Sequence, residues 1–224
     1  MFELPINTIV NKSIPKNVFE SYTNSRQKKV LTSVVGKIRW TNKFSPQTVN
    51  LDGLEVKEIQ LIEVLLKQKE SISEITNVID RVIPYNIIFV IRFENEIMLS
   101  VSQKHKHPTN ENQAVVDWTF TSSWYNAGNF PFRLNLQQSL DFVFSDICFQ
   151  ISGNQVKARF DLKTLIAFEQ RKKQLIDQIQ RLESAIKTCK QFNKKVELNL
   201  ELQKCKSDFE NNDNYSAINL FLND

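Results

Sequence analysis

A repeat of apolar residues near the C-terminus constrains the fold of this chain more than any other feature. From Leu165 onward, apolar side chains recur at spacings of three and four, and Lys172 and Asn193 interrupt the series. This heptad spacing is typical of a helix that packs against another helix. The series consists of Leu165, Phe168, Leu175, Ile179, Leu182, Ile186, Cys189, Val196 and Leu200.

A second apolar stripe follows the same spacing in a different phase, with Leu198, Leu202, Cys205 and Phe209 as its members. One straight helix cannot present both stripes on one seam. A chain reversal around Lys190 to Lys194 therefore predicts an antiparallel helical hairpin over residues 156–210. The alternative is a continuous helix that forms a homodimeric coiled coil, with Asn193 as a buried residue that sets the register.

Residues 1–155 show shorter segments in which helical and strand periodicities alternate, and residues 211–224 form an acidic tail. We expect an α+β body with a mixed sheet of about five strands flanked by helices, followed by the helical hairpin or coiled coil. Ser71-x-x-Glu74 predicts a capping box at the start of one helix, which Pro84 ends. The other expected elements are a helix over Pro15–Val30, strands over Val34–Thr41, Val56–Leu66, Asn86–Phe93, Glu96–Gln103 and Ala114–Thr121, and a helix over Leu136–Ile151.

The scarcity of glycine, histidine and cysteine excludes several kinds of site. The 4 glycines are isolated, so neither glycine-rich phosphate-binding fingerprint occurs. The 2 histidines and 3 scattered cysteines match no zinc-binding spacing, so we predict no metal and no cofactor. An odd, unspaced cysteine count and the lack of a long apolar stretch predict a cytoplasmic protein that is not embedded in a membrane.

The formal net charge of +4 conceals opposing blocks. Residues 1–50 and 151–206 are strongly basic, whereas residues 51–150 and the tail are acidic. Segregated positive charge is typical of proteins that bind polyanions, although solvated helices show it too. The candidate residues for contact with nucleic acid or a partner are Lys37, Arg39, Trp40, Lys43, Arg171, Lys172, Lys173, Lys190, Lys194 and Lys195.

Two carboxylates are candidate catalytic groups. Glu63 falls in a strand that is apolar on both faces, and Asp117 falls in an alternating strand. A buried carboxylate needs a charged partner or a raised pKa, so either residue could be a structural ion-pair member or a hydrolase acid. The acid-x-Lys patterns expected of a nuclease core occur no more often than composition predicts.

Several segments of the sequence together resemble a known family. The chain is similar over nearly its whole length to a prokaryotic family called domain of unknown function 4391, whose genes tend to lie beside those of helicases and DNA methyltransferases in restriction or phage-defence clusters. The resemblance rests on Ile14–Lys16, Lys37–Asn50, Glu58–Leu61, Ile83–Phe89 and Lys190–Asn199. It implies an accessory role in DNA processing or defence, and it brings no catalytic residues with it.

The expected function is therefore that of a non-enzymatic accessory protein. It would dock a helicase or DNA methyltransferase, and DNA itself is the other expected ligand. The competing class is a nuclease or other hydrolase that uses Glu63 and Asp117. An antitoxin-like or purely structural partner is a third alternative.

Overall fold

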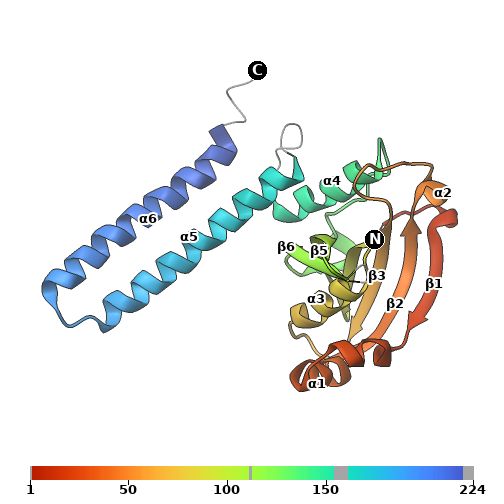
Figure 1. Ribbon diagram of the computed structural model, residues 1–224, viewed down its shortest axis with the longest axis horizontal. Helices are drawn as coiled ribbons and strands as arrows, with labels where there is room; N and C mark the ends of the chain where they lie inside the picture. The colour runs from red at the N-terminus through yellow and green to blue at the C-terminus, as the bar shows by residue number, and fades with distance from the viewer. Residues whose placement is uncertain (1, 111–112, 154–160, 219–224) are drawn as a thin grey trace. The chain divides into compact units, whose positions relative to one another are not determined.

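The computed structural model describes residues 2–110, 113–153 and 161–218 and divides the chain into two compact units, Met1–Gly153 and Asn154–Asp224. The expected boundary between residues 155 and 156, and residues 219–224 of the acidic tail, lie outside the described residues. Each unit is described by itself below. The first unit is an α+β body, and the second is a pair of long helices (Figure 1).

The body contains a sheet of seven strands, two more than the sequence indicates. Six of them follow chain order across the sheet, and a short seventh strand pairs with β5. Only β3 and β4 pair in parallel among the described strands, because helix α3 connects them as a crossover. The strands are β1 (Ile9–Ile14), β2 (Val35–Phe44), β3 (Ile59–Leu66), β4 (Asn86–Phe93), β5 (Glu96–Lys106), β6 (Ala114–Thr121) and β7 (Tyr125–Asn126).

The N-terminal region differs most from expectation. Residues 9–14 form β1 although only Ile9, Val10 and Ile14 are apolar, because β1 is an edge strand that pairs with β2 alone. The helix expected over Pro15–Val30 is also wrong. The chain instead forms a 3-10 helix, η2 (Lys16–Tyr22), followed by α1 (Ser25–Ser33), which Asn24 and Gln27 begin with a capping box.

Helices α1 and α3 (Ser73–Val82) cover one face of the sheet. Their apolar residues pack on alternate side chains of β2, β3 and β4 and form a single buried cluster. The apolar side chains on the inner face of α3 are buried or half-buried, as in an amphipathic helix that covers a sheet. The fully buried members of the cluster are Phe19, Leu31, Val34, Val35, Ile38, Ile62, Val64, Ile72, Ile75, Ile79, Ile87, Phe89 and Ile91.

The capping box expected at Ser71 and Glu74 does not form. Helix α3 begins at Ser73, its N-cap residue is Ile72, and no side chain caps it. Glu74 instead pairs with Arg26 of α1 at 3.3 Å. The hydroxyl groups of Ser71 and Ser73 lie 3.2 Å apart at the start of the helix.

Helix α4 (Leu140–Ser152) buries an apolar face and holds the loop before β3 in place. Asp141 accepts hydrogen bonds from the backbone N–H groups of Leu54, Glu55 and Val56 at 2.6, 2.9 and 2.8 Å. Gly53 allows this close approach, because a Cβ atom there would lie 2.1 Å from the Val56 carbonyl oxygen. The remaining short helices of the body are η1 (Ile6–Thr8), α2 (Pro46–Val49) and η3 (Ala127–Asn129).

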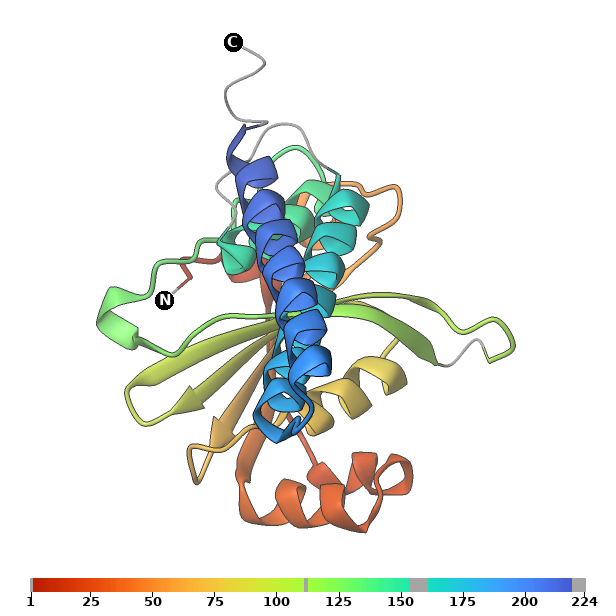
Figure 2. The same ribbon diagram turned by 90° about the vertical axis from the view of Figure 1, so that its left-hand side faces the viewer.

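The second unit is a helical hairpin, as the two apolar stripes predict. Helices α5 (Leu162–Thr188) and α6 (Phe192–Ile218) run side by side in opposite directions in both views (Figures 1 and 2). Leu175 and Leu182 of α5 and Cys205 of α6 are buried. The chain does not continue as one helix, because α5 ends at Thr188 and α6 begins at Phe192. No glycine or proline marks the turn between them.

Candidate functional site

Glu63 forms ion pairs with arginines on both neighbouring strands of the sheet. Its carboxylate lies 2.5 Å from the Arg39 guanidinium of β2 and 2.7 Å from that of Arg92 on β4. The side chain of Glu63 is 8% exposed, so both arginines compensate a carboxylate that has lost most of its water. This geometry fits an ion pair that joins three strands, because each carboxylate oxygen contacts one arginine.

Asp117 lies in a different part of the sheet. It is the extra residue of a β-bulge on β6, and its Oδ1 lies 2.8 Å from Nδ1 of His105. Strands β4 and β5 separate Glu63 from Asp117, and neighbouring strands lie about 4.8 Å apart, so roughly 14 Å lies between their strands. The structure does not bring these two carboxylates together as one acid–base pair.

The basic and aromatic residues of β2 do not share one face. A bulge between Trp40 and Asn42 shifts the register, so Lys37 and Arg39 face one side of the sheet and Trp40 and Lys43 face the other. Lys43 pairs with Glu58 at 2.5 Å, and the Trp40 indole donates to the Asn42 carbonyl at 3.1 Å. Lys37 remains the exposed member of the set.

Other positive charges of the first fifty residues are also engaged inside the body. The ammonium group of Lys16 donates to the carbonyls of Leu31 and Val35 at 3.2 and 2.9 Å, and burial lowers its pKa from the ordinary value. Arg26, Arg39 and Lys43 contact acidic side chains. Part of the basic block at the N-terminus therefore holds the fold together, whereas Lys12, Lys28, Lys29 and Lys37 are exposed.

A buried ion pair joins α3 to β5. Lys104 Nζ lies 3.0 Å from Asp80 Oδ1 and also donates to the carbonyls of Asp80 and Ile83 at 2.9 and 2.8 Å. Burial raises the pKa of Asp80 and lowers the pKa of Lys104, while the attraction between the two charges opposes both shifts. Because three acceptors surround one ammonium group, the pair fixes the end of α3 on the sheet.

The lysines and arginine in the first half of α5 have mixed surroundings. Arg171 and Lys173 are exposed, whereas Lys172 is half-buried with its ammonium group 5.7 Å from the Phe209 ring centroid. That distance is within the range of a cation–π contact. Lys172 is therefore part of the packing between α5 and α6.

The turn between the two helices carries the most accessible positive charge that the structure describes. No acidic residue occurs between Glu183 and Glu197, and this interval contains four lysines. Their ammonium groups are exposed and contact no acidic side chain among the described residues. These residues are Lys187, Lys190, Lys194 and Lys195.

An apolar stripe accompanies these lysines on α6. Phe192 is 79% exposed, Val196 44% and Leu200 62%, and their spacing of four residues places them on one helix face. The four lysines and these three apolar residues are called the hairpin tip below. Exposed apolar side chains grouped on one face are typical of a surface that binds another macromolecule.

The sequence indicates part of this surface. It places Lys190, Lys194 and Lys195 among the contact residues, and the structure presents all three at the tip. It assigns Val196 and Leu200 to a buried seam together with Asn193, but all three are exposed. The phase of the second stripe indicates that Val196 and Leu200 are exposed, because Leu198 and Leu202 can face α5 only when Val196 and Leu200 face away from it.

The described residues contain no group of three or more potential metal-binding side chains among their His, Cys, Asp and Glu residues. In the same part of the chain, none of the helices combines the length and apolar content needed to cross a bilayer.

Comparison with known proteins gives one match. A family model described as "Domain of unknown function (DUF4391)" matches residues 2–209, which covers both the body and most of the hairpin. No curated protein and no solved structure matches the chain.

Proposed function

We propose, for a chain that belongs to the DUF4391 family, a role as a non-enzymatic accessory protein that docks a DNA-processing enzyme through the hairpin tip. The observation that carries this proposal is the exposure of Phe192, Val196 and Leu200 on one face of α6 beside four unpaired lysines. An apolar centre with a charged surround is the usual composition of a protein interface. The partner that we propose is a helicase or DNA methyltransferase of a restriction or phage-defence system.

The charge of the tip adds specificity to this docking. Lysines at the rim of an interface accelerate association with an acidic surface and disfavour basic partners. A partner with an acidic patch around an apolar groove would therefore complement the tip. Because the lysines lie on both sides of the turn, they would also fix the direction from which the partner approaches.

A co-purification experiment tests the proposal. The full-length protein is co-expressed with a helicase or a methyltransferase encoded beside a gene of this family, and each is recovered through a tag on the accessory protein. A tip variant carries Phe192→Ser, Val196→Ser and Leu200→Ser, which should prevent recovery of the partner. The matched control replaces three exposed apolar residues of the body, Ile6, Ile9 and Leu54, with serine.

Direct contact with DNA is the second candidate function, and the four lysines of the tip favour it. Lysines that neutralise phosphates release counterions, so the affinity for DNA should fall steeply as salt rises. Replacing the four tip lysines with glutamine should weaken binding of a labelled duplex and flatten its salt dependence. The matched control replaces four exposed lysines of the body, Lys12, Lys28, Lys29 and Lys106, which gives the same net charge.

Salt-dependent binding that is equal in both lysine variants would contradict a DNA site at the tip. An absence of salt-dependent binding by the unmodified protein would remove direct DNA contact and leave docking to a protein.

A further inference from the structure

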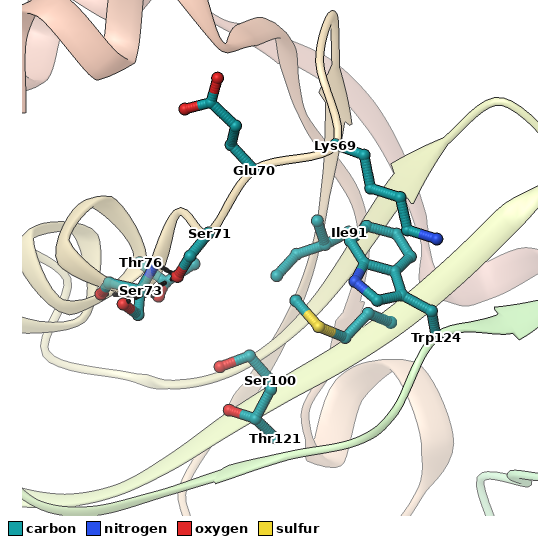
Figure 3. A pocket seen from close by; sticks show the side chains of 10 residues that line it. Lys69, Glu70, Ser71, Ser73, Thr76, Ile91, Ser100, Thr121 and Trp124 are labelled. Carbon is teal, nitrogen blue, oxygen red and sulfur yellow. Dashed lines mark hydrogen bonds between the residues drawn. The ribbon is translucent and has the colours of Figure 1, made fainter.

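A pocket on the helix-covered face of the sheet has the features of a ligand site. It encloses about 320 Å³ and lies where the chain leaves β3 and enters α3 (Figure 3). Its lining residues are Lys69, Glu70, Ser71, Ser73, Thr76, Ile91, Met98, Ser100, Thr121 and Trp124.

Three kinds of surface surround the space. Hydroxyl groups of Ser71, Ser73 and Thr76 occupy one side, and the Trp124 indole stands on the opposite side (Figure 3). The apolar side chains of Ile91 and Met98 come from paired positions of β4 and β5. The pocket thus combines a flat aromatic wall, hydroxyl groups from the start of α3, and a floor of strand residues that carries Ser100 and Thr121 as well as Ile91 and Met98.

Ser100 is the residue that points most directly to a ligand. It is only 3% exposed, and its side chain makes no hydrogen bond with the described residues. Its hydroxyl group is directed into the pocket (Figure 3). The Ser100 oxygen keeps some accessible surface on the pocket, so a ligand atom would replace water as its hydrogen-bond partner. Buried Thr76 offers a second oxygen on the α3 side of the pocket, since its own O–H donates to the Ser73 carbonyl at 3.1 Å, and Thr121 of β6 lies beside Ser100 (Figure 3).

The charges around the pocket disfavour an anionic ligand. Lys69 is the only basic residue that lines it, and its ammonium group is paired with Glu96 at 2.5 Å. The same ammonium group lies 5.2 Å from the Trp124 ring centroid, in cation–π contact. Glu70 at the rim adds negative charge. These charges disfavour an anion, and a neutral ligand is compatible with them.

The aromatic wall favours a flat ligand. A nucleobase has two apolar faces and one polar edge, so one face can stack on the Trp124 indole while the edge bonds to hydroxyl groups of the lining. The volume is at the lower end of the range for small-molecule sites and suits a base or a nucleoside.

We propose that this pocket binds a neutral nucleobase, presented by a free nucleoside or by an unpaired residue of a strand. The base stacks on Trp124, and its hydrogen-bonding edge faces Ser100 and Thr76. The site lies wholly within the body, so it does not depend on the function proposed for the hairpin tip.

Isothermal titration calorimetry with the full-length protein tests the proposal. The ligands are adenosine, guanosine, cytidine and thymidine, followed by the 5′-monophosphate of whichever nucleoside binds, a short single-stranded oligonucleotide and methyl glucoside. We expect at least one nucleoside to bind with a dissociation constant below about 1 mM. The 5′-phosphate should bring no gain in affinity. Tighter binding of the oligonucleotide than of the nucleoside would identify a strand as the source of the base.

Variants separate the site from general folding effects. Ser100→Ala and Thr76→Val remove one hydroxyl group each with little change in volume, and each should weaken nucleoside binding about five-fold or more. Trp124→Leu should abolish binding, whereas Trp40→Phe, which changes a tryptophan on β2, should leave it unchanged.

Three results would overturn the proposal. They are no nucleoside binding up to about 10 mM, nucleoside affinity in Ser100→Ala and Trp124→Leu equal to that of the unmodified protein, or binding of methyl glucoside as tight as that of the nucleoside. Pocket variants should still co-purify with the partner of the hairpin tip, and tip variants should still bind nucleosides. This pattern makes failure of the pocket proposal distinguishable from failure of the docking proposal.

Discussion

The ammonium group of Lys104 lies 3.0 Å from Asp80 Oδ1, and each of these two side chains is only 1% exposed. The pair connects α3 to β5, on the same face of the sheet as the pocket lined by Thr76 and Ser100. Removing one member would leave an uncompensated charge in the interior, which costs more than the pair itself contributes.

Substitution of one partner should therefore destabilise the fold strongly. We expect Lys104→Met to lower the free energy of unfolding by about 3 to 5 kcal/mol. The double variant Asp80→Leu with Lys104→Met should recover a large part of that loss, because no charge is left unpaired. Urea unfolding followed by circular dichroism measures both values. Lys106→Met, at the exposed end of β5, is the control and should change stability little. A double variant as unstable as the sum of the single variants would contradict this interpretation.

The Asp141 carboxylate should make stability depend on acid pH. Burial alone would raise its pKa, but the three backbone N–H donors outweigh burial and hold the pKa below its ordinary value. Because the folded state then binds this proton less tightly than the unfolded state, the contribution is present above the unfolded pKa of about 3.9 and is lost as pH falls through the lower folded value.

Asp141→Asn should accordingly lower the free energy of unfolding by about 2 kcal/mol at pH 7. The difference from the unmodified protein should shrink as pH falls below about 4. Urea titrations at neutral and acidic pH provide the measurement, with Asp52→Asn as the control on the same loop. A difference that persists unchanged in acid would show that the charge of Asp141 is not the cause.

Glu63 and Asp117 should respond differently to substitution. Glu63→Gln should lower the free energy of unfolding by about 2 kcal/mol, because two arginines lose their charged partner. Asp117→Asn should have an effect below about 0.5 kcal/mol, because its contact with the His105 ring is largely exposed. Thermal unfolding of the two variants compares them. If Glu63→Gln left stability unchanged, the result would contradict the ion-pair role of Glu63 and favour a catalytic role.

Thiol labelling should report the hairpin in solution. Burial raises the pKa of the Cys148 thiol, and Cys205 is buried on α6, so both should react slowly with iodoacetamide. Cys189, half-buried at the turn, should react first. Mass spectrometry of timed samples measures the order. Rapid labelling of Cys205 in the folded protein would contradict the packing of α6 on α5.

The sequence predicts the helical and strand segments well where apolar periodicity is strong. The stripes at Leu175 and Leu198 predict the hairpin, and the apolar run of β3 predicts a doubly covered strand. Apolar periodicity does not predict the edge strand β1, because β1 is mostly polar and is held by pairing with β2 rather than by its own burial. The capping box at Ser71 fails because α3 begins at Ser73 with Ile72 as its N-cap residue, and Glu74 contacts Arg26 of α1 instead.

The candidate sites were only partly predictable for a related reason. Charge clusters can be counted along a chain, but whether Arg39 or Lys190 is available depends on which acids lie beside it in the fold. Arg39 is paired with Glu63, whereas Lys190 is not paired with any described residue. The pocket combines Ser100 and Thr76 from different elements with Trp124 from a loop, and no spacing in the sequence predicts that combination.

The most direct test of the account is the dissociation constant between the full-length protein and its helicase or methyltransferase partner, measured for the unmodified chain, the tip variant and the body control. Loss of three apolar contacts at the tip should raise the dissociation constant about 30-fold or more, while the Ile6, Ile9 and Leu54 control should bind like the unmodified protein. Equal affinity of the tip variant and the unmodified protein, or no binding of either partner by the unmodified protein, would contradict the hairpin tip as the docking surface.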